Sequence, residues 1–299
     1  MKIVVTGATG FIGSHVAVRL AKAGHQVVAA GRNPLKVPAL GKVEGITLQR
    51  GDLTDPDSWE PVLAGADALV HIALGWGDSG LEMLRNDTEA SIRLFQTAVD
   101  AGVKRVIYTS STAACGEMAS LNREDMAPKP MDFYGATKAG TESYLRAFGH
   151  QHKIQVHIVR PGYIFGEPIV EGASSQPDRR FSDLARAAKL GESIHLVQHD
   201  GTQFLHASDI AEVYLALMSS TSTTPTVHYA LSSQWRSWEE VAMLAQEILG
   251  RKVDVVLEDK GYGKDPYLFS VDGIRQDFGL DFPNLDRLRE HVRWELSRS

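Results

Sequence analysis

A glycine-rich turn near the start of the chain restricts the fold more than any other segment. The sequence KIVVTGATGFIGSHVAVRL places Gly7, Gly10 and Gly13 between a β-branched run and an apolar helical stretch. In a turn of this kind the first glycine permits a tight bend, the second lets a pyrophosphate approach the backbone, and the third lets the helix pack closely. Because the helix N-terminus faces the phosphates, the segment predicts a strand, a turn and a helix that bind a dinucleotide.

Short apolar strands alternate with longer helical stretches along the first half of the chain. Strands that are buried on both faces are short and largely apolar, and their alternation with helices is typical of right-handed βαβ units. We therefore predict an α/β fold with a doubly wound parallel sheet, a Rossmann fold, and a smaller C-terminal substrate-binding region. The predicted strands cover 3–5, 26–30, 46–49, 68–72, 105–109 and 156–159, and the predicted helices cover 12–23, 84–101 and 134–151.

The second half of the chain has weaker patterns. The segment EPIVEGASSQPDRR at 167–180 contains Gly, Ser and Pro without periodicity, which predicts a loop over a substrate pocket. Beyond it we predict strands at 202–206, 227–230 and 253–257, a helix at 208–219 with Ser208 as its N-cap, a helix that follows Ser237, and a last helix at 286–298. We expect residues 1–165 to form the NAD(P)-binding domain, with a return to it around 200–232, and residues 166–199 and 233–299 to form the substrate-binding region.

Composition excludes several classes of partner. The formal net charge of −6 leaves no broad basic surface for a nucleic acid or an anionic membrane, so a small-molecule substrate is expected. The single cysteine, Cys115, excludes an internal disulfide and a cysteine-rich metal site. No apolar run approaches the roughly 20 residues that cross a bilayer, and the start MKIVVTG lacks the apolar core of a signal peptide. We expect a cytoplasmic protein without a bound metal.

Further motifs follow the glycine turn in a fixed order. They are GDL at 51–53, HIALG at 71–75, Asn86, YTSSTAACG at 108–116, YGATK at 134–138 and RPGYIFG at 160–166. With TGATGFIG, this series resembles the extended short-chain dehydrogenase/reductase family, which includes NAD-dependent epimerases and dehydratases. The resemblance is good over about the first 165 residues and poor beyond them, where a substrate would be recognised. The turn and the resemblance together predict cofactor contacts from Gly7, Thr9, Gly10, Phe11, Ile12, Gly13, Asp52, Leu53, Ala73, Leu74, Gly75, Lys138 and Pro161.

The end of the second predicted strand bears on the choice of cofactor. An acidic residue about 20 positions after the glycines binds the ribose 2′-hydroxyl of NAD, whereas an arginine accepts the 2′-phosphate of NADP. Here Gly31 stands at the acidic position and Arg32 follows it, where a forked bond to phosphate can form. AAGRNP also resembles the cofactor segment of dihydroflavonol-reductase-like members, which use NADPH. We expect NADP, and the alternative is NAD bound without an acidic partner, with Arg32 as a solvated charge.

A tyrosine and a lysine on the helix predicted at 134–151 carry the expected chemistry. Tyr134 and Lys138 are four residues apart, so they share one face of the helix. An unperturbed phenol, with a pKa of about 10, is a poor base at neutral pH, but a neighbouring ammonium favours the phenolate. Tyr134 is therefore the predicted proton carrier. The resemblance implies that Lys138 also bonds the nicotinamide ribose and that Ser111 bonds the reacting oxygen, with Thr112 as the alternative hydroxyl.

Three functions fit these residues. The first is an NADP-dependent oxidoreductase that reduces an aldehyde or ketone, or oxidises the alcohol. The second is a nucleotide-sugar epimerase with retained NAD, and the third is a regulator that senses NADP without turnover. The complete Ser, Tyr and Lys set argues against the sensor.

Two departures from the family pattern argue against nucleotide-sugar chemistry. Dehydratases carry TDE where this chain has Ser111, Thr112 and Ala113, and epimerases carry Asn in the slot of Tyr163. We expect Trp76, Thr112 and Tyr163 to face a modest carbonyl substrate. The resemblance also suggests a homodimer through paired helices.

Overall fold

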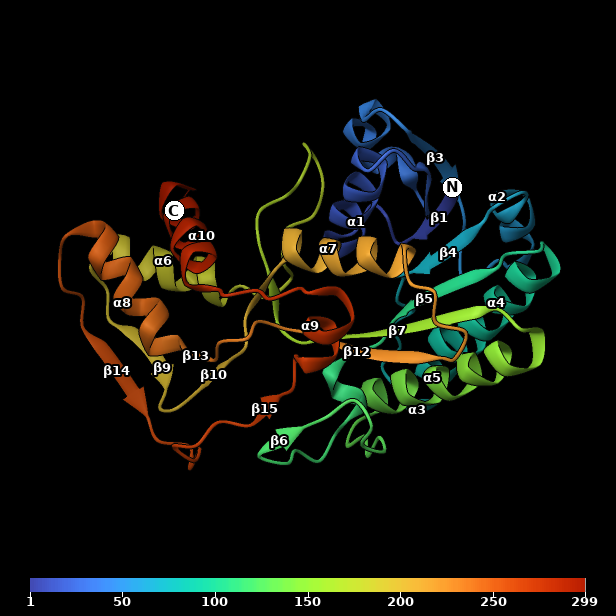
Figure 1. Ribbon diagram of the computed structural model, residues 1–299. Helices are drawn as coiled ribbons and strands as arrows, with labels where there is room; N and C mark the ends of the chain where they lie inside the picture. Colours follow the sequence, from blue (N-terminus) through green and yellow to red (C-terminus); the bar gives the residue numbers. More distant parts are fainter. Residues whose placement is uncertain (299) are drawn as a thin grey trace.

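The computed structural model describes residues 1–298 and is built on a seven-stranded parallel sheet (Figure 1). The strand order is β12-β7-β5-β4-β1-β2-β3. This arrangement confirms the doubly wound parallel sheet expected from the sequence. The strands are β1 (Lys2–Thr6), β2 (Gln26–Gly31), β3 (Ile46–Arg50), β4 (Ala68–His71), β5 (Arg105–Thr109), β7 (Gln155–Pro161) and β12 (Thr226–Ala230).

Helices cover both faces of the sheet. Successive strand side chains point to opposite faces, and in β1 this places Ile3 and Val5 in one hydrophobic core and Val4 in the other. Helices α1 (Phe11–Lys22) and α7 (Ala207–Met218) pack side by side on the first face (Figure 1). Helices α2 (Glu60–Leu63), α4 (Ala90–Asp100) and α5 (Phe133–His152) cover the second. The result is a three-layer α/β/α architecture.

The chain reverses its direction across the sheet between β1 and β4. From β1 it proceeds outward to β2 and β3, whereas from β4 it proceeds to β5, β7 and β12 on the other side. In open α/β sheets, ligands bind in the crevice at the carboxyl ends of the strands at such a switch point. Gly7 follows β1 with a φ of +66°, and a Cβ there would lie 2.8 Å from the Ala73 nitrogen. The glycine turn is therefore pressed against the loop that follows β4.

The C-terminal helices form a separate layer beside the sheet (Figure 1). Helices α6 (Arg180–Leu190), α8 (Trp238–Leu249) and α10 (Leu285–Arg298) share one core, which includes the rings of Phe181, Phe204 and Trp238. Ser237 caps α8 through a reciprocal pair of hydrogen bonds with Glu240. Short strands pair around these helices: β9 (Ile194–Val197) with β14 (Val255–Glu258), β10 (Gly201–Thr202) with β13 (Arg236–Ser237), and β8 (Ile164–Phe165) with β11 (Leu205–His206).

The remaining elements are short. They are β6 (Leu121–Asn122), which pairs with β15 (Leu268–Phe269), helix α3 (Gly80–Met83), a π-helical turn η4 (Leu84–Glu89), helix α9 (Asp272–Phe278), and the 3-10 turns η1 (Pro34–Lys36), η2 (Pro38–Lys42), η3 (Pro56–Trp59) and η5 (Thr112–Ala114). Residues 167–179 form an irregular loop, as predicted. Within residues 1–298, no helix combines the length and the apolar character needed to cross a membrane.

Some predicted elements differ from the structure. The strand expected at 202–206 is interrupted at Gln203, whose buried amide bonds the backbone of Ser232 and Phe269 instead of continuing a ladder. The helix that follows begins at Ala207, so its N-cap is His206, which accepts from the Ser208 nitrogen at 3.2 Å, and Ser208 is not the cap. The helix expected at 84–101 starts earlier, at Gly80, and contains the π-helical turn.

Candidate functional site

A cavity of about 750 Å³ lies at the carboxyl ends of β1 and β4. The cavity is lined by residues of the glycine turn, the ends of β2 and β3, the loop after β4, the end of β5, and α5. The fold therefore gathers motifs that are up to about half the chain apart. Of the residues singled out from the sequence, it is lined by Gly7, Thr9, Gly10, Phe11, Ile12, Gly13, Arg32, Asp52, Leu53, Ala73, Leu74, Gly75, Trp76, Ser111, Tyr134, Lys138 and Pro161.

The start of α1 gives this cavity a site for phosphate groups. Gly10 is the N-cap and has no side chain that could occupy the backbone donors of the first turn, and that turn contains no acidic residue. Unpaired donors and the positive end of the helix dipole favour an anion. A Cβ on Gly13 would overlap the Gly7 carbonyl oxygen, so the glycine is needed for the helix to approach the turn. These features fit the pyrophosphate of a dinucleotide.

The ends of β2 and β3 form the opposite part of the cavity. Gly31 ends β2 and has no side chain, and a Cβ there would lie 3.3 Å from the Thr9 hydroxyl oxygen. Arg32 is exposed and lines the cavity, and within residues 1–298 it has no ion-pair partner. Arg50, which lies opposite Gly31 in the sheet, is instead paired with Asp55 at 3.0 Å. Arg32 is thus the arginine available to a phosphate here.

Tyr134 and Ser111 are positioned by two adjoining caps. Asp132 caps α5 by accepting from the Gly135 nitrogen at 2.6 Å, which places Tyr134 in the first turn. Ser111 caps η5 by accepting from the Ala113 nitrogen at 3.1 Å, so its hydroxyl proton is left for the cavity. A Cβ on Gly135 would overlap the Ala113 carbonyl oxygen. Because this position is glycine, the two caps meet and both hydroxyls border the same end of the cavity.

Lys138 lies one turn beyond Tyr134 and is buried. Only 3% of its side chain is exposed, and its Nζ lies 3.4 Å from Oδ2 of Asp87. The same nitrogen lies 5.2 Å from the ring centre of Tyr108 and 5.8 Å from that of Tyr134. Burial alone would lower the pKa of Lys138, but the interactions with Tyr108, Asp87 and Tyr134 outweigh it and raise that pKa above its ordinary value. The ammonium is therefore charged at neutral pH.

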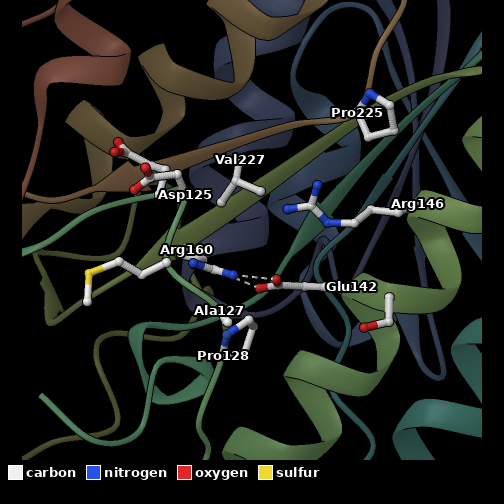
Figure 2. Close-up of a pocket in the computed structure, with 11 residues that line it drawn as sticks. Asp125, Ala127, Pro128, Glu142, Arg146, Arg160, Pro225 and Val227 are labelled. Atoms are coloured by element: carbon white, nitrogen blue, oxygen red, sulfur yellow. Dashed lines mark hydrogen bonds and ion pairs between the residues drawn. The ribbon is translucent and has the colours of Figure 1, made fainter.

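Ser110 also lines the cavity but is committed to a different contact. Its hydroxyl donates to Oε1 of Glu142, and Glu142 is held by Arg160 through Nη2–Oε2 at 2.7 Å and Nε–Oε1 at 2.9 Å. The Arg160–Glu142 pair in turn lines a second cavity of about 490 Å³, where Figure 2 shows the two side chains joined by dashed lines. Ser110 thus ties the segment after β5 to a buried ion pair, so its hydroxyl is engaged, whereas the hydroxyl proton of Ser111 is free at the cavity.

Two residues that were expected at the substrate end do not line the cavity. Gly162 and Ile164 line it, so in this extended segment Tyr163 points to the opposite side. Its ring packs against Phe204 and Trp238 with centroid separations of 5.2 and 5.7 Å. The structure therefore places Tyr163 outside the cavity lining, in contrast to the expectation that it faces the substrate.

Thr112 opens η5 and is directed at Gly162, where a Cβ would lie 3.8 Å from its methyl group. It also lies outside the cavity lining. Trp76, by contrast, is 62% exposed at the cavity, with its ring centre 6.3 Å from that of Tyr134.

The sequence reasoning missed three charged residues near the site: Asp87, Glu142 and Arg160. Tyr134, Lys138 and Glu142 follow one another at intervals of four, which was a readable signal for a polar stripe on α5. Asp87 lies four residues after the buried Met83 and seven before the buried Leu94, so it interrupts an apolar helical stripe with an acid. Within residues 1–298, no group of three His, Cys, Asp or Glu is arranged to hold a metal ion.

Comparison with known proteins places this geometry among related enzymes. A family model described as the NAD dependent epimerase/dehydratase family matches residues 3–231. UDP-glucose 4-epimerase of Azospirillum brasilense is 30% identical, with 99% of this chain and 91% of the relative aligned. Dihydroflavonol 4-reductase of Zea mays is 25% identical over 71% of this chain and 66% of the relative. The structure of MoeE5 in complex with UDP-glucuronic acid and NAD is 28% identical, covers 100% of this chain and 99% of its own, and superposes with a TM-score of 0.80.

Proposed function

Because the chain belongs to the NAD dependent epimerase/dehydratase family, we propose that it is an NADP-dependent reductase of an aldehyde or ketone, which can also run in reverse on the alcohol. The observation that carries the proposal is one cavity with Arg32 beside Gly31 at one end and Ser111, Tyr134 and Lys138 at the other. The first end matches a 2′-phosphate. The second end provides the hydroxyl donors and the positive charge that the reduction of a carbonyl to an alcohol requires.

Ser111, Tyr134 and Lys138 have different roles in this reaction. When bound in this cavity, a reduced nicotinamide cofactor would supply the hydride that adds to the carbonyl carbon. Ser111 donates its free hydroxyl proton in a hydrogen bond to the carbonyl oxygen, where negative charge develops. Tyr134 gives its phenolic proton to that oxygen, which completes the alcohol. The charged Lys138 stabilises the phenolate left behind and holds the cofactor ribose.

The charges of the cavity support a substrate without a nucleotide diphosphate. Its lining contains two cations, of which Arg32 lies at the adenosine end and Lys138 is already paired with Asp87. A diphosphate at the substrate end would therefore meet no free cation in the lining. An exposed aromatic side chain is present there instead, Trp76 with 62% exposure. Apolar walls with few polar groups are typical of small-molecule sites in general, and a small carbonyl compound fits such a surface without a cation.

A nucleotide-sugar epimerase is the second candidate. It is favoured by the identity to the UDP-glucose 4-epimerase and by the similarity to MoeE5 along its whole length. In this case NAD would stay bound and the loop at 167–179 would supply contacts to the nucleotide.

One pair of measurements separates the two candidates. The NADP-loaded protein is titrated calorimetrically with UDP, UDP-glucose and dTDP-glucose, and NADPH oxidation is screened with aromatic and aliphatic aldehydes and ketones. We expect carbonyl reduction and no nucleotide binding in the low micromolar range, about 8 kcal/mol. Low micromolar binding of a nucleotide together with no carbonyl reduction would overturn the reductase and favour the epimerase.

The cofactor preference is tested at Arg32. Replacing Arg32 with Ala removes a charge-assisted contact worth about 1.5 to 3 kcal/mol, so NADP affinity should fall about tenfold or more while NAD affinity changes little. The measurement is a titration of each variant with both cofactors. Arg50→Ala is the matched control. Arg50 lies beside Gly31 on the neighbouring strand β3, but its guanidinium is already paired with Asp55. Equal losses for NADP and NAD in Arg32→Ala would argue against this assignment.

The proposal also covers the organisation of the chain. Residues 1–165 and about 200–232 would hold the cofactor, and residues 166–199 and 233–298 would shape the substrate site, while position 299 lies outside the described residues. Exposed apolar side chains on α3, η4 and α5, namely Leu81, Leu84, Phe133 and Tyr144, support a homodimer through these helices. The single, buried Cys115 fits a cytoplasmic location.

A further inference from the structure

Asp87 lies in the π-helical turn η4 and is fully buried. Its Oδ1 accepts a hydrogen bond from the Gly75 nitrogen at 3.0 Å, and its Oδ2 lies 3.4 Å from Nζ of Lys138. One carboxylate thus contacts both a backbone segment of the cofactor cavity and the lysine of the catalytic set. π-Helical turns inside helices are frequent at functional sites. Here the turn brings an acid to the buried side of the helix.

We propose that Asp87 is a positioning residue that holds the Lys138 ammonium charged and in place, while it fixes the Gly75 backbone against the cavity. The inference rests on the proposed function for the role of Lys138 in catalysis. Gly75 is suited to this contact, because a Cβ there would overlap the Asn86 carbonyl oxygen and prevent the loop from approaching η4. The loop after β4 and the lysine on α5 are therefore tied to the same carboxylate.

The surroundings of Lys138 show why a counter-ion is needed. Tyr108 on β5, Tyr134 on α5 and Tyr214 on α7 are phenols, and burial raises the pKa of Tyr108 and of Tyr214 above the ordinary value. His71 on β4 is fully buried, and burial together with the charge of Lys138 lowers its pKa to about 3, so it is neutral at pH 7. Among these neighbours Asp87 is the one carboxylate. A buried ammonium without such a partner loses its proton far more readily.

The sign of the expected effect follows from this charge. The form that reduces a carbonyl carries a proton on both Tyr134 and Lys138. A negative charge beside the pair stabilises that form, and removing the charge makes the first proton leave at lower pH. Asp87→Asn keeps an oxygen that can accept from Gly75 but removes the charge. The alkaline limb of kcat/KM should therefore move to lower pH by about one unit or more.

A direct titration of Lys138 tests the proposal without a substrate. The protein is labelled with ¹³Cε-lysine, and the Lys138 resonance is assigned by its loss in Lys138→Arg. We expect the resonance of the unsubstituted protein to show no proton loss up to the highest pH at which the protein is folded. In Asp87→Asn we expect proton loss from Lys138 to become visible within that pH range. Asp87→Ser, which also keeps an acceptor without charge, gives the same reading if Asp87→Asn does not fold.

A matched control and a second variant complete the design. Glu89→Gln removes a charge from the same turn, but Glu89 is exposed and paired with Arg93, so the Lys138 titration should not change. Asp87→Ala removes both the charge and the acceptor, and should weaken NADPH binding about tenfold relative to Asp87→Asn. A Lys138 titration that is the same with and without the Asp87 charge would overturn the proposal. If the Lys138 titration shifts in Asp87→Asn but the protein reduces no carbonyl compound, the proposed reductase activity is refuted and the role of Asp87 is not.

Discussion

Replacing Tyr134 with Phe is expected to lower turnover of a carbonyl substrate about 100-fold or more, the usual scale of general acid catalysis. The substitution keeps the ring, which lies 6.3 Å from that of Trp76, and removes only the proton that the product oxygen needs. Cofactor affinity should be largely kept, because the phosphate cradle and Arg32 are unchanged. The measurement is steady-state NADPH oxidation, with cofactor affinity determined separately for each variant.

The same helix provides the control for this experiment. Tyr144 also lies on α5 but does not line the cavity, so Tyr144→Phe, which keeps the ring at the proposed dimer contact, should retain normal turnover. Lys138→Ala should reduce both turnover and cofactor affinity, since the ammonium serves both. Near-normal turnover in Tyr134→Phe, once a substrate is known, would remove Tyr134 from the mechanism.

The sheet and the cavity lining could be predicted because they depend on local patterns. Gly7 and Gly13 indicate a tight turn that residues with a side chain do not readily form. The right-handedness of βαβ units then determines which strand ends lie together. The apolar stripe of α6, with Phe181, Leu184, Ala185 and Ala188 buried, is a further local pattern in the sequence that indicates a helix.

The side that a residue faces was harder to predict. Tyr163 stands beside a strand of two residues, and its orientation depends on a register that a short strand does not determine locally. The N-cap of α7 is His206 and not the expected Ser208. A tertiary contact, between Nε2 of His206 and Oε2 of Glu167 at 3.0 Å, fixes the His206 ring at the start of the helix. The acid at Asp87 is visible in the sequence, but its contacts with Gly75 and Lys138 depend on the π-helical turn, which shifts the helical periodicity.

The buried pair behind Ser110 should be among the most sensitive points for stability. Arg160 and Glu142 are joined at 2.7 Å with side-chain exposures of 1% and 2%. Arg160→Met leaves the Glu142 carboxylate buried without its counter-ion. Breaking a buried pair in this way typically costs about 3–5 kcal/mol of the free energy of unfolding.

An exposed pair of the same length provides the comparison for Arg160→Met. Arg93 and Glu89 are also joined at 2.7 Å, but their side chains are 58% and 47% exposed. Arg93→Met should therefore cost at most about 0.5 kcal/mol. Urea unfolding followed by tryptophan fluorescence measures both losses. The double variant Arg160→Met with Glu142→Leu should regain most of the stability lost in Arg160→Met, because paired removal leaves no buried charge. Similar small losses for Arg160→Met and Arg93→Met would mean that burial does not set the strength of the Arg160–Glu142 contact.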